Sequence, residues 1–291
     1  MRRPATALLV LALACAALPA AEFSGESALR LTAGAVALGP RPPGSPAHHR
    51  LQDYIRSRLK QWRCEVIDDA FLARTPRGPV HMNNIIARFP GSSGRAIVFS
   101  GHYDTKWLPR IRFLGANDGG SSTGLLLELA RVLAGRKRKH DLYLVWFDGE
   151  EAFGPWSDTD GIYGSRHLAR RWADDGTLGR ITALVNVDMI GDRDLKILRE
   201  YYSTPSLLRR IWQVAADLGY RRHFLDSTGA VEDDHVPFLR LGVTAANLID
   251  FNYGPKNSYW HTEQDTMDKL SPASFEVVGK VLLELLRRLE Q

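Results

Sequence analysis

The residues of this sequence best suited to chemistry are acids and imidazoles that come shortly after strongly apolar segments. They are His102, Asp118, Glu150, Glu151, Asp188 and His261. The apolar segments near them are 96–100, 142–147, 181–187 and 244–249. A single His or Asp in such a place more often forms a structural hydrogen bond or caps a turn. Their repetition after successive apolar segments instead indicates one shared site.

The mixture of carboxylates and imidazoles indicates a metal site. Carboxylates gathered in a partly buried cleft repel one another and lose hydration, at a cost on the order of several kcal/mol each unless a cation joins them. Imidazole and carboxylate ligands together suit zinc. Asp104, two residues after His102, is a candidate acceptor for the second imidazole N–H of that histidine. We therefore predict zinc as the cofactor.

The adjacent acids Glu150 and Glu151 are the most informative pair. If Glu151 binds the metal, Glu150 stays free to exchange a proton with a reacting group. The alternative is an exposed acidic turn, but the pair follows a strongly apolar segment, which favours a position at the edge of a buried strand.

The elements that must position these residues are strands and helices in alternation. The four apolar segments predict buried central strands, and weaker strand patterns cover 64–72 and 84–89. Helical patterns cover 46–61, 122–133, 164–172, 206–218 and 272–289, and a further helix precedes Pro40. This order predicts an α/β fold: a single domain with a mostly parallel central β-sheet and helices on both faces, a three-layer sandwich. Ligands of such sheets bind beyond the carboxyl ends of the strands, where the polar residues fall.

The amino terminus has the layout of a secretory signal peptide. Arg2 and Arg3 precede an apolar run and the small residues Ala20 and Ala21. The run is shorter than the roughly 20 residues that span a bilayer. We predict that 1–21 is a signal peptide and 22–291 the catalytic domain, exported to the periplasm or the medium. Anchoring as a lipoprotein through Cys15 is the alternative.

Charge and cysteine content exclude some classes of protein. Without Cys15 only Cys64 remains, so no intrachain disulfide can form and the core must hold the fold. The net charge of +5 is too small to indicate a nucleic-acid partner, and we expect the basic run 136–139 to be a solvated turn. No later segment is apolar and long enough to span a membrane.

These motifs resemble the zinc exopeptidase family that includes co-catalytic aminopeptidases and animal-type glutaminyl cyclases. The resemblance extends from 39–45 to 261–262. It implies a zinc aminopeptidase-like fold and an acid/base role for Glu150. It also implies that the metal shell consists of His102, Asp118, Glu151, Asp188 and His261.

The finer resemblance is to glutaminyl-peptide cyclotransferases. It rests on the segments 147–153, 156–157, 163–168, 233–239 and 260–262. It implies one zinc held by Asp118, Glu151 and His261, with Asp188 and Asp233 in a proton-transfer network. The sequence departs from the animal cyclases at Asn247, where they carry His, and 115–120 looks more like the aminopeptidases.

The resemblance implies cyclisation of an amino-terminal glutamine to pyroglutamate, with release of ammonia and Glu150 as the proton carrier. We expect Trp156 and Trp260 to form walls of the substrate pocket and Asn247 to contact the substrate. The partners would be amino termini of peptides or proteins, and we expect a monomer.

Two other functions stay open. The first is a two-zinc aminopeptidase that hydrolyses amino-terminal residues, with His102 and Asp188 holding the second ion. The second is a non-enzymatic binding protein that keeps zinc for structure, which the free acid Glu150 argues against because structural zinc sites close their fourth position with Cys or His.

Overall fold

The structure is a computed structural model that describes residues 21–291. The predicted signal peptide, including Cys15, lies outside the described residues except for Ala21. The strands are β1 (Glu65–Thr75), β2 (Gly78–Phe89), β3 (Ala96–His102), β4 (Asp141–Phe147), β5 (Ile181–Asp188), β6 (Ile197–Glu200), β7 (Phe224–Gly229) and β8 (Ala245–Ile249). The helices are α1 (Gly25–Val36), α2 (Pro46–Gln61), α3 (Gly120–Leu133), α4 (Tyr163–Asp174), α5 (Pro205–Asp217), α6 (Val236–Arg240) and α7 (Pro272–Leu289). Short 3₁₀ turns are η1 (Leu178–Arg180), η2 (Arg221–His223), η3 (Pro255–Asn257) and η4 (Met267–Lys269).

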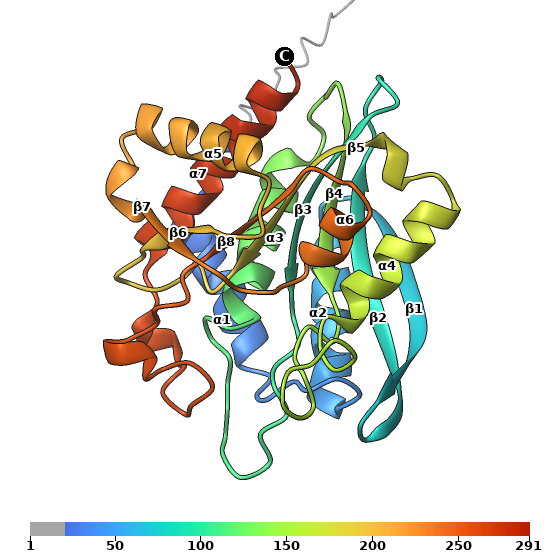
Figure 1. The fold of residues 1–291 in the computed structure, drawn as a ribbon, viewed down its shortest axis with the longest axis vertical. Helices are drawn as coiled ribbons and strands as arrows, with labels where there is room; N and C mark the ends of the chain where they lie inside the picture. The colour runs from blue at the N-terminus through green and yellow to red at the C-terminus, as the bar shows by residue number, and fades with distance from the viewer. Residues whose placement is uncertain (1–20) are drawn as a thin grey trace, which may run out of the picture.

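The central sheet has six strands in the order β1-β2-β4-β3-β5-β8 (Figure 1). Strands β4, β3, β5 and β8 run parallel to their neighbours, whereas β1 and β2 form an antiparallel hairpin and β2 is antiparallel to β4. The carboxyl ends of the four parallel strands therefore meet at one edge, and the predicted mostly parallel sheet is confirmed.

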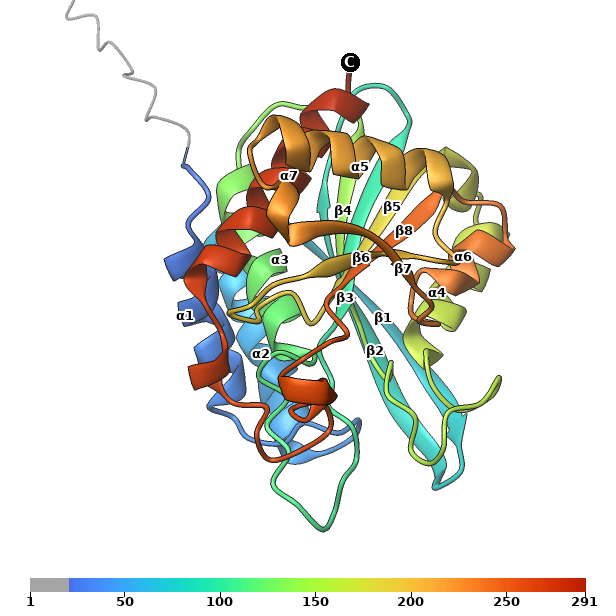
Figure 2. The same ribbon diagram turned by 60° about the vertical axis from the view of Figure 1, so that its left-hand side comes forward.

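Helices cover both faces of this sheet (Figures 1 and 2). Alternate residues of each strand point to opposite faces. In β3, Ile97 and Phe99 belong to the core shared with α1, α2, α3, α5 and α7, whereas Val98 packs on the side of Trp172 in α4 and Phe238 in α6. Both faces are apolar because both are covered, which accounts for the continuous apolar runs in the sequence.

The amino-terminal helices pack tightly against α3. The α2 helix begins as its sequence indicates, with the Ser45 side chain accepting from the His48 N–H and Pro46 in the first turn. In α3, a Cβ added at Gly124 would lie 2.0 Å from Thr32 Oγ1 and 2.6 Å from the Ala28 carbonyl of α1. Only glycine allows α1 and α3 to approach this closely.

Several boundaries and elements differ from the prediction. The edge strand β1 continues to Thr75 and β2 already begins at Gly78, because the two form a long hairpin whose outer half is partly exposed and lacks an apolar run. The parallel pair β6 and β7 and the short helix α6 were not predicted. None of the described helices has the length and apolar character needed to cross a membrane.

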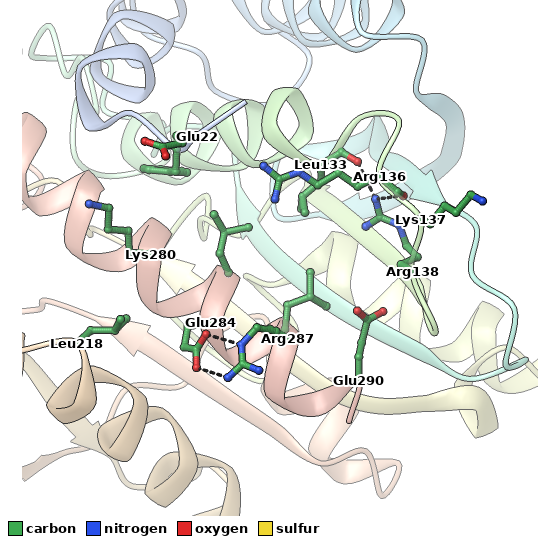
Figure 3. Close-up of a pocket in the computed structure, with 13 residues that line it drawn as sticks. Glu22, Leu133, Arg136, Lys137, Arg138, Leu218, Lys280, Glu284, Arg287 and Glu290 are labelled. Carbon is green, nitrogen blue, oxygen red and sulfur yellow. Dashed lines mark hydrogen bonds and ion pairs between the residues drawn. The ribbon is translucent and has the colours of Figure 1, made fainter. Parts of the chain in front are cut away.

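A groove of about 580 Å³ lies between the end of α3, the basic run 136–138 and α7 (Figure 3). Two of its charged side chains have partners nearby: Arg287 pairs with Glu284, and Arg138 lies over the Phe89 ring and donates to the Leu133 carbonyl. Arg136, Lys137 and Lys139 are exposed, as expected for a solvated turn, whereas Arg138 is half-buried. The groove holds neither of the acid and imidazole clusters described below.

Candidate active site

A pocket of about 410 Å³ opens at the carboxyl ends of the parallel strands. Its walls come from the segments that follow β3, β4, β5 and β8 and from the segment before α6. Its charged lining includes Asp118, Glu150, Glu151, Asp188, Asp233 and His261. The structure thus brings to one cavity five of the six residues singled out first from the sequence, and the sixth, His102, lies directly behind it, where it contacts Asp118 and Asp188.

Three of these side chains form a cluster that could hold a metal ion: Asp118, Glu151 and His261. The Nε2 atom of His261 lies 2.8 Å from Glu151 Oε1 and 3.3 Å from Asp118 Oδ2. His261 adopts a positive φ of 54°, which is uncommon for a residue with a side chain and aims its imidazole at the acids.

A second cluster shares Asp118 with the first and adds His102 and Asp188. The Nε2 atom of His102 lies 3.2 Å from Asp118 Oδ1 and 3.1 Å from Asp188 Oδ1. Asp118 therefore offers one oxygen to each cluster, an arrangement that can bridge two cations.

The donor atoms fit zinc. Ligand atoms arranged tetrahedrally at zinc-ligand distances near 2.1 Å lie roughly 3.4 Å apart, and the first cluster has spacings of 2.8 and 3.3 Å. Among the described residues, Asp118 Oδ2 is buried and accepts no hydrogen bond, although His261 Nε2 lies 3.3 Å away. A buried carboxylate oxygen without a partner is costly, and a cation bound there removes that cost.

Mutual charge shifts the protonation of these groups. Burial alone would lower the pKa of His261, but the neighbouring Glu151 and Asp118 raise it to about 9. Burial raises the pKa of Asp188 to about 7 against the opposing effect of His102. The metal-free site thus holds protons at neutral pH that a bound cation would displace.

Glu150 belongs to neither cluster, yet it lies in the same pocket. Burial raises the pKa of its carboxyl well above the ordinary value, the His102 charge opposes this rise, and Glu151 adds to it. A carboxyl with a raised pKa can accept and return a proton near neutral pH.

Asp104 positions this pair of acids through their backbone. Its two oxygens accept the N–H groups of Glu150, at 3.1 Å, and of Glu151, at 3.3 Å. The hydrogen bond expected between Asp104 and the His102 ring is not formed: Oδ1 and Nδ1 lie 3.5 Å apart, and Nδ1 has no partner among the described residues. The Asp104 carboxylate instead accepts hydrogen bonds from the backbone at the start of the loop that follows β4.

The Asp118 segment is held from two sides. Asp265 accepts the backbone N–H groups of Asn117, at 2.8 Å, and of Asp118, at 3.2 Å. Gly119 has a φ of 73°, and a Cβ there would lie 2.3 Å from the Asp104 carbonyl. Glycine is therefore required next to Asp118.

Arg41, between α1 and α2, is fully buried beside the same segment. Its guanidinium donates to the carbonyls of Leu114, at 2.6 Å, and Gly115, at 2.9 Å. Burial lowers the pKa of Arg41 to about 10, while the charges of Asp265 and Asp118 oppose the decrease. The side chain thus stays positive behind the acidic cluster.

Aromatic side chains flank the pocket. Trp260 stacks on the His261 imidazole, with ring centroids 3.9 Å apart, and meets Phe251 edge-on. Trp156 is 40% exposed at the rim, and its Nε1 donates to Glu232 Oε2 at 3.3 Å. Both tryptophans expected as pocket walls line the cavity.

Asn247 does not line the cavity. It is fully buried in β8, and its Nδ2 donates to Asp233 Oδ2 at 2.7 Å. The expected direct contact with substrate is therefore not supported by its position, because Asp233 lies between Asn247 and the pocket.

Sequence reasoning missed other residues of the site. Lys106 lines the pocket, and its Nζ lies 3.4 Å from Glu151 Oε2 and 2.9 Å from the Ala152 carbonyl. His48 is fully buried, and its Nε2 lies 2.8 Å from Asp148 Oδ1. Neither has a local sequence signal, since each depends on contacts between distant segments.

Comparison with known proteins places these features in a family. The sequence pattern of peptidase family M28 matches residues 84–286. The glutaminyl-peptide cyclotransferase of Drosophila melanogaster is 34% identical over 269 residues, covering 84% of this chain and 75% of that protein.

Solved structures agree with this comparison. The fold is similar to a glutaminyl cyclase from an Acidobacteriales bacterium, with a TM-score of 0.90 and 41% identity over 98% of this chain and 99% of that one. It is also similar to a leucine aminopeptidase precursor from Bacteroides thetaiotaomicron, with a TM-score of 0.83 and 25% identity over 93% and 99% of the two chains. These likenesses agree with the predicted zinc aminopeptidase-like architecture.

Proposed function

Because the chain belongs to peptidase family M28, we propose that it is a metal-dependent glutaminyl-peptide cyclotransferase, which closes the amino-terminal glutamine of peptides into pyroglutamate and releases ammonia. The observation that carries the proposal is a carboxyl with a raised pKa, Glu150, in the same cavity as the Asp118, Glu151 and His261 cluster.

Zinc held by Asp118, Glu151 and His261 would supply the positive charge that polarises the side-chain carbonyl of the glutamine. The α-amine of the substrate attacks the carbonyl carbon of the side-chain amide, and a new C–N bond forms. Glu150 accepts the proton that the amine loses and delivers it to the departing amide nitrogen, so the C–N bond of the amide breaks and ammonia leaves. No water is consumed.

The pocket walls favour cyclisation by orienting the substrate. Trp260 and Phe251 present apolar surface beside the metal cluster, and Trp156 closes the rim. Holding the amine against its own side chain in a small pocket gives the folded conformation that ring closure requires. The stacked Trp260 also restricts the His261 ring to one orientation.

The test is an assay of products with a peptide that begins with glutamine. We expect release of one ammonia per peptide and a product lighter by the mass of ammonia, with no free amino acid. Zinc analysis of the same preparation should give about one ion per chain if Asp118, Glu151 and His261 hold it. Release of free glutamine without pyroglutamate would refute the proposal.

A two-zinc aminopeptidase is the second candidate, and the cluster of His102, Asp118 and Asp188 favours it. In that case Glu150 would take a proton from an attacking water, and the products would be a free amino acid and a shortened peptide. About two zinc ions per chain with amino acid release from peptides of any amino-terminal residue would support this candidate over cyclisation.

We further propose that residues 1–21 are removed during export and that residues 22–291 act as a single catalytic domain and as a monomer. Arg2, Arg3 and the apolar run after them support export. Amino-terminal sequencing of protein from the periplasm and the medium should begin near Glu22, and a lipid attached at Cys15 would show anchoring instead. Light scattering should give the mass of one chain.

A further inference from the structure

Two asparagines on neighbouring strands face the same acid of the pocket wall. Asn186 of β5 and Asn247 of β8 are register partners in the parallel sheet, so their side chains lie on one face. The Nδ2 of Asn186 donates to Asp233 Oδ1 at 3.0 Å, and the Nδ2 of Asn247 donates to Asp233 Oδ2 at 2.7 Å. Both asparagines are fully buried, where an unpaired amide would be costly.

Further hydrogen bonds fix the orientation of both amides. The Ser100 hydroxyl donates to Asn186 Oδ1 at 2.9 Å, which leaves the amide nitrogen to face Asp233. The same nitrogen also donates to Asn247 Oδ1 at 3.2 Å. The backbone N–H of Asn247 is accepted by Ser203 Oγ at 2.9 Å, which anchors β8 at this point. The side-chain oxygen and nitrogen of both asparagines therefore all have hydrogen-bond partners.

Asp233 is the end of this network on the pocket side. Its carboxylate accepts one amide on each oxygen, and Oδ1 also accepts the backbone N–H of Asp234. A carboxylate offers about four acceptor positions, so about one remains for a group in the pocket. The side chain lines the cavity together with Glu150 and Asp188. A substrate N–H that enters the pocket can use this remaining position.

We infer that Asn186 and Asn247 are positioning residues, which hold the Asp233 carboxylate at the pocket wall so that it can accept an N–H of the bound glutamine substrate. The inference rests on the proposed function for the identity of the substrate. The asparagines touch no substrate atom, and they act only through Asp233.

The test uses leucine, which has the same number and branching of side-chain heavy atoms as asparagine but no hydrogen-bonding group. Asn247→Leu and Asn186→Leu are made in the native sequence and in an Asp233→Ala background, and kcat and KM are measured by ammonia release. We expect each single variant to lower kcat by about tenfold to a hundredfold, because a catalytic pocket tolerates little misplacement. In the Asp233→Ala background, adding Asn247→Leu should change kcat by less than about twofold, since the group it positions is gone.

Asn83→Leu is the matched control. Asn83 is also buried in the sheet, and its Nδ2 donates to Asp68 Oδ1 at 2.7 Å, away from the pocket. This variant removes an asparagine-aspartate bond that is only partly buried, because the Asp68 side chain is 50% exposed, so it measures the cost of losing a sheet asparagine away from the pocket. We expect its kcat to stay within about twofold of the native value, even where urea unfolding shows lower stability.

Two results would overturn the inference: an Asn247→Leu effect as large in the Asp233→Ala background as in the native sequence, or single variants with native kcat. A crystal structure of Asn247→Leu provides a readout that needs no activity. The Asp233 carboxylate should turn away from its native position, and an unmoved carboxylate would contradict the proposal that Asn247 holds it in place. Failure of the native protein to release ammonia would count against the proposed function alone, because the carboxylate position is measured independently.

Discussion

Glu150 and Glu151 are neighbours in sequence with different surroundings. Glu151 contacts His261 and Lys106, whereas Glu150 belongs to neither metal cluster and has a raised pKa. The two carboxyls can therefore take different roles, one as ligand and one as proton carrier.

Replacement of Glu150 by glutamine tests that division directly. The substitution keeps the size of the side chain and removes the exchangeable proton, so kcat for ammonia release should fall by about 10²- to 10⁴-fold. KM and the zinc content should change little, because the ligands are intact. Steady-state kinetics and metal analysis on one preparation measure both, and a kcat within a factor of about three of native would remove Glu150 from the mechanism.

The zinc content of single-ligand variants shows which of the two clusters holds the ion. Asp118 belongs to both clusters, so Asp118→Ala should abolish zinc binding. His102 belongs only to the second cluster, so His102→Ala should retain about one zinc per chain. Elemental analysis after dialysis makes the measurement. Loss of all zinc from His102→Ala would show that the ion sits in the second cluster.

The sequence predicts single residues well where a strand end marks them. Glu150, Glu151 and Asp188 follow apolar strands directly, and their position at the sheet edge follows from that fact alone. Lys106 and Asn186 carry no such mark. Their partners lie 45 and 47 residues away in sequence, and only the folded sheet brings them together.

At the scale of elements, the predicted central strands and long helices agree with the structure to within a few residues. Apolar runs covered on both faces give a strong signal, as in β4, where every residue is buried. The β6 and β7 pair was missed because these strands are short and β7 is mostly exposed, so no periodic apolar pattern marks it.

The contact of α1 with α3 makes a prediction about elements. In Gly124→Ala the new methyl group would collide with backbone atoms of α1, which forces the helices apart. We expect a loss of about 1–3 kcal/mol in the free energy of unfolding, measured in urea, although alanine favours helix formation. Gly179→Ala is the control, because nothing lies within 4 Å of its added Cβ. Equal stability of the two variants would contradict the tight packing.

At the scale of the whole molecule, alternation of strand and helix was enough to predict the three-layer architecture. It could not give the strand order, in which β3 lies between β4 and β5, because order depends on how crossover connections pack. The order matters for function, since it places the ends of β3 and β5 side by side and so brings His102 close to Asp188.

The pH dependence of folding should report buried acids outside the metal clusters. Burial raises the pKa of Asp250 to about 7 from an ordinary value of 3.8, so the folded state holds a proton that the unfolded state has lost. Its contribution to stability is complete below about pH 4 and is lost as pH rises through 7, by up to about 4 kcal/mol.

Asp250→Asn removes this titration. The variant should be less stable than the native protein at pH 5, because it loses an acceptor for the N–H of Lys196 or Asn252. At pH 8 the difference in the free energy of unfolding between the two proteins should be smaller by roughly a few kcal/mol. Urea unfolding across this range gives the comparison, and parallel profiles for the two proteins would show that Asp250 does not titrate on folding.

The position of Arg41 bears on whether the protein folds before or after it binds metal. The Arg41 guanidinium is a positive charge supplied by the protein itself, and backbone carbonyls hold it beside the Asp118 segment. Repulsion among the acids is thus relieved in part while the polypeptide is still an apoprotein. We therefore expect that the chain can fold before any metal ion binds at Asp118.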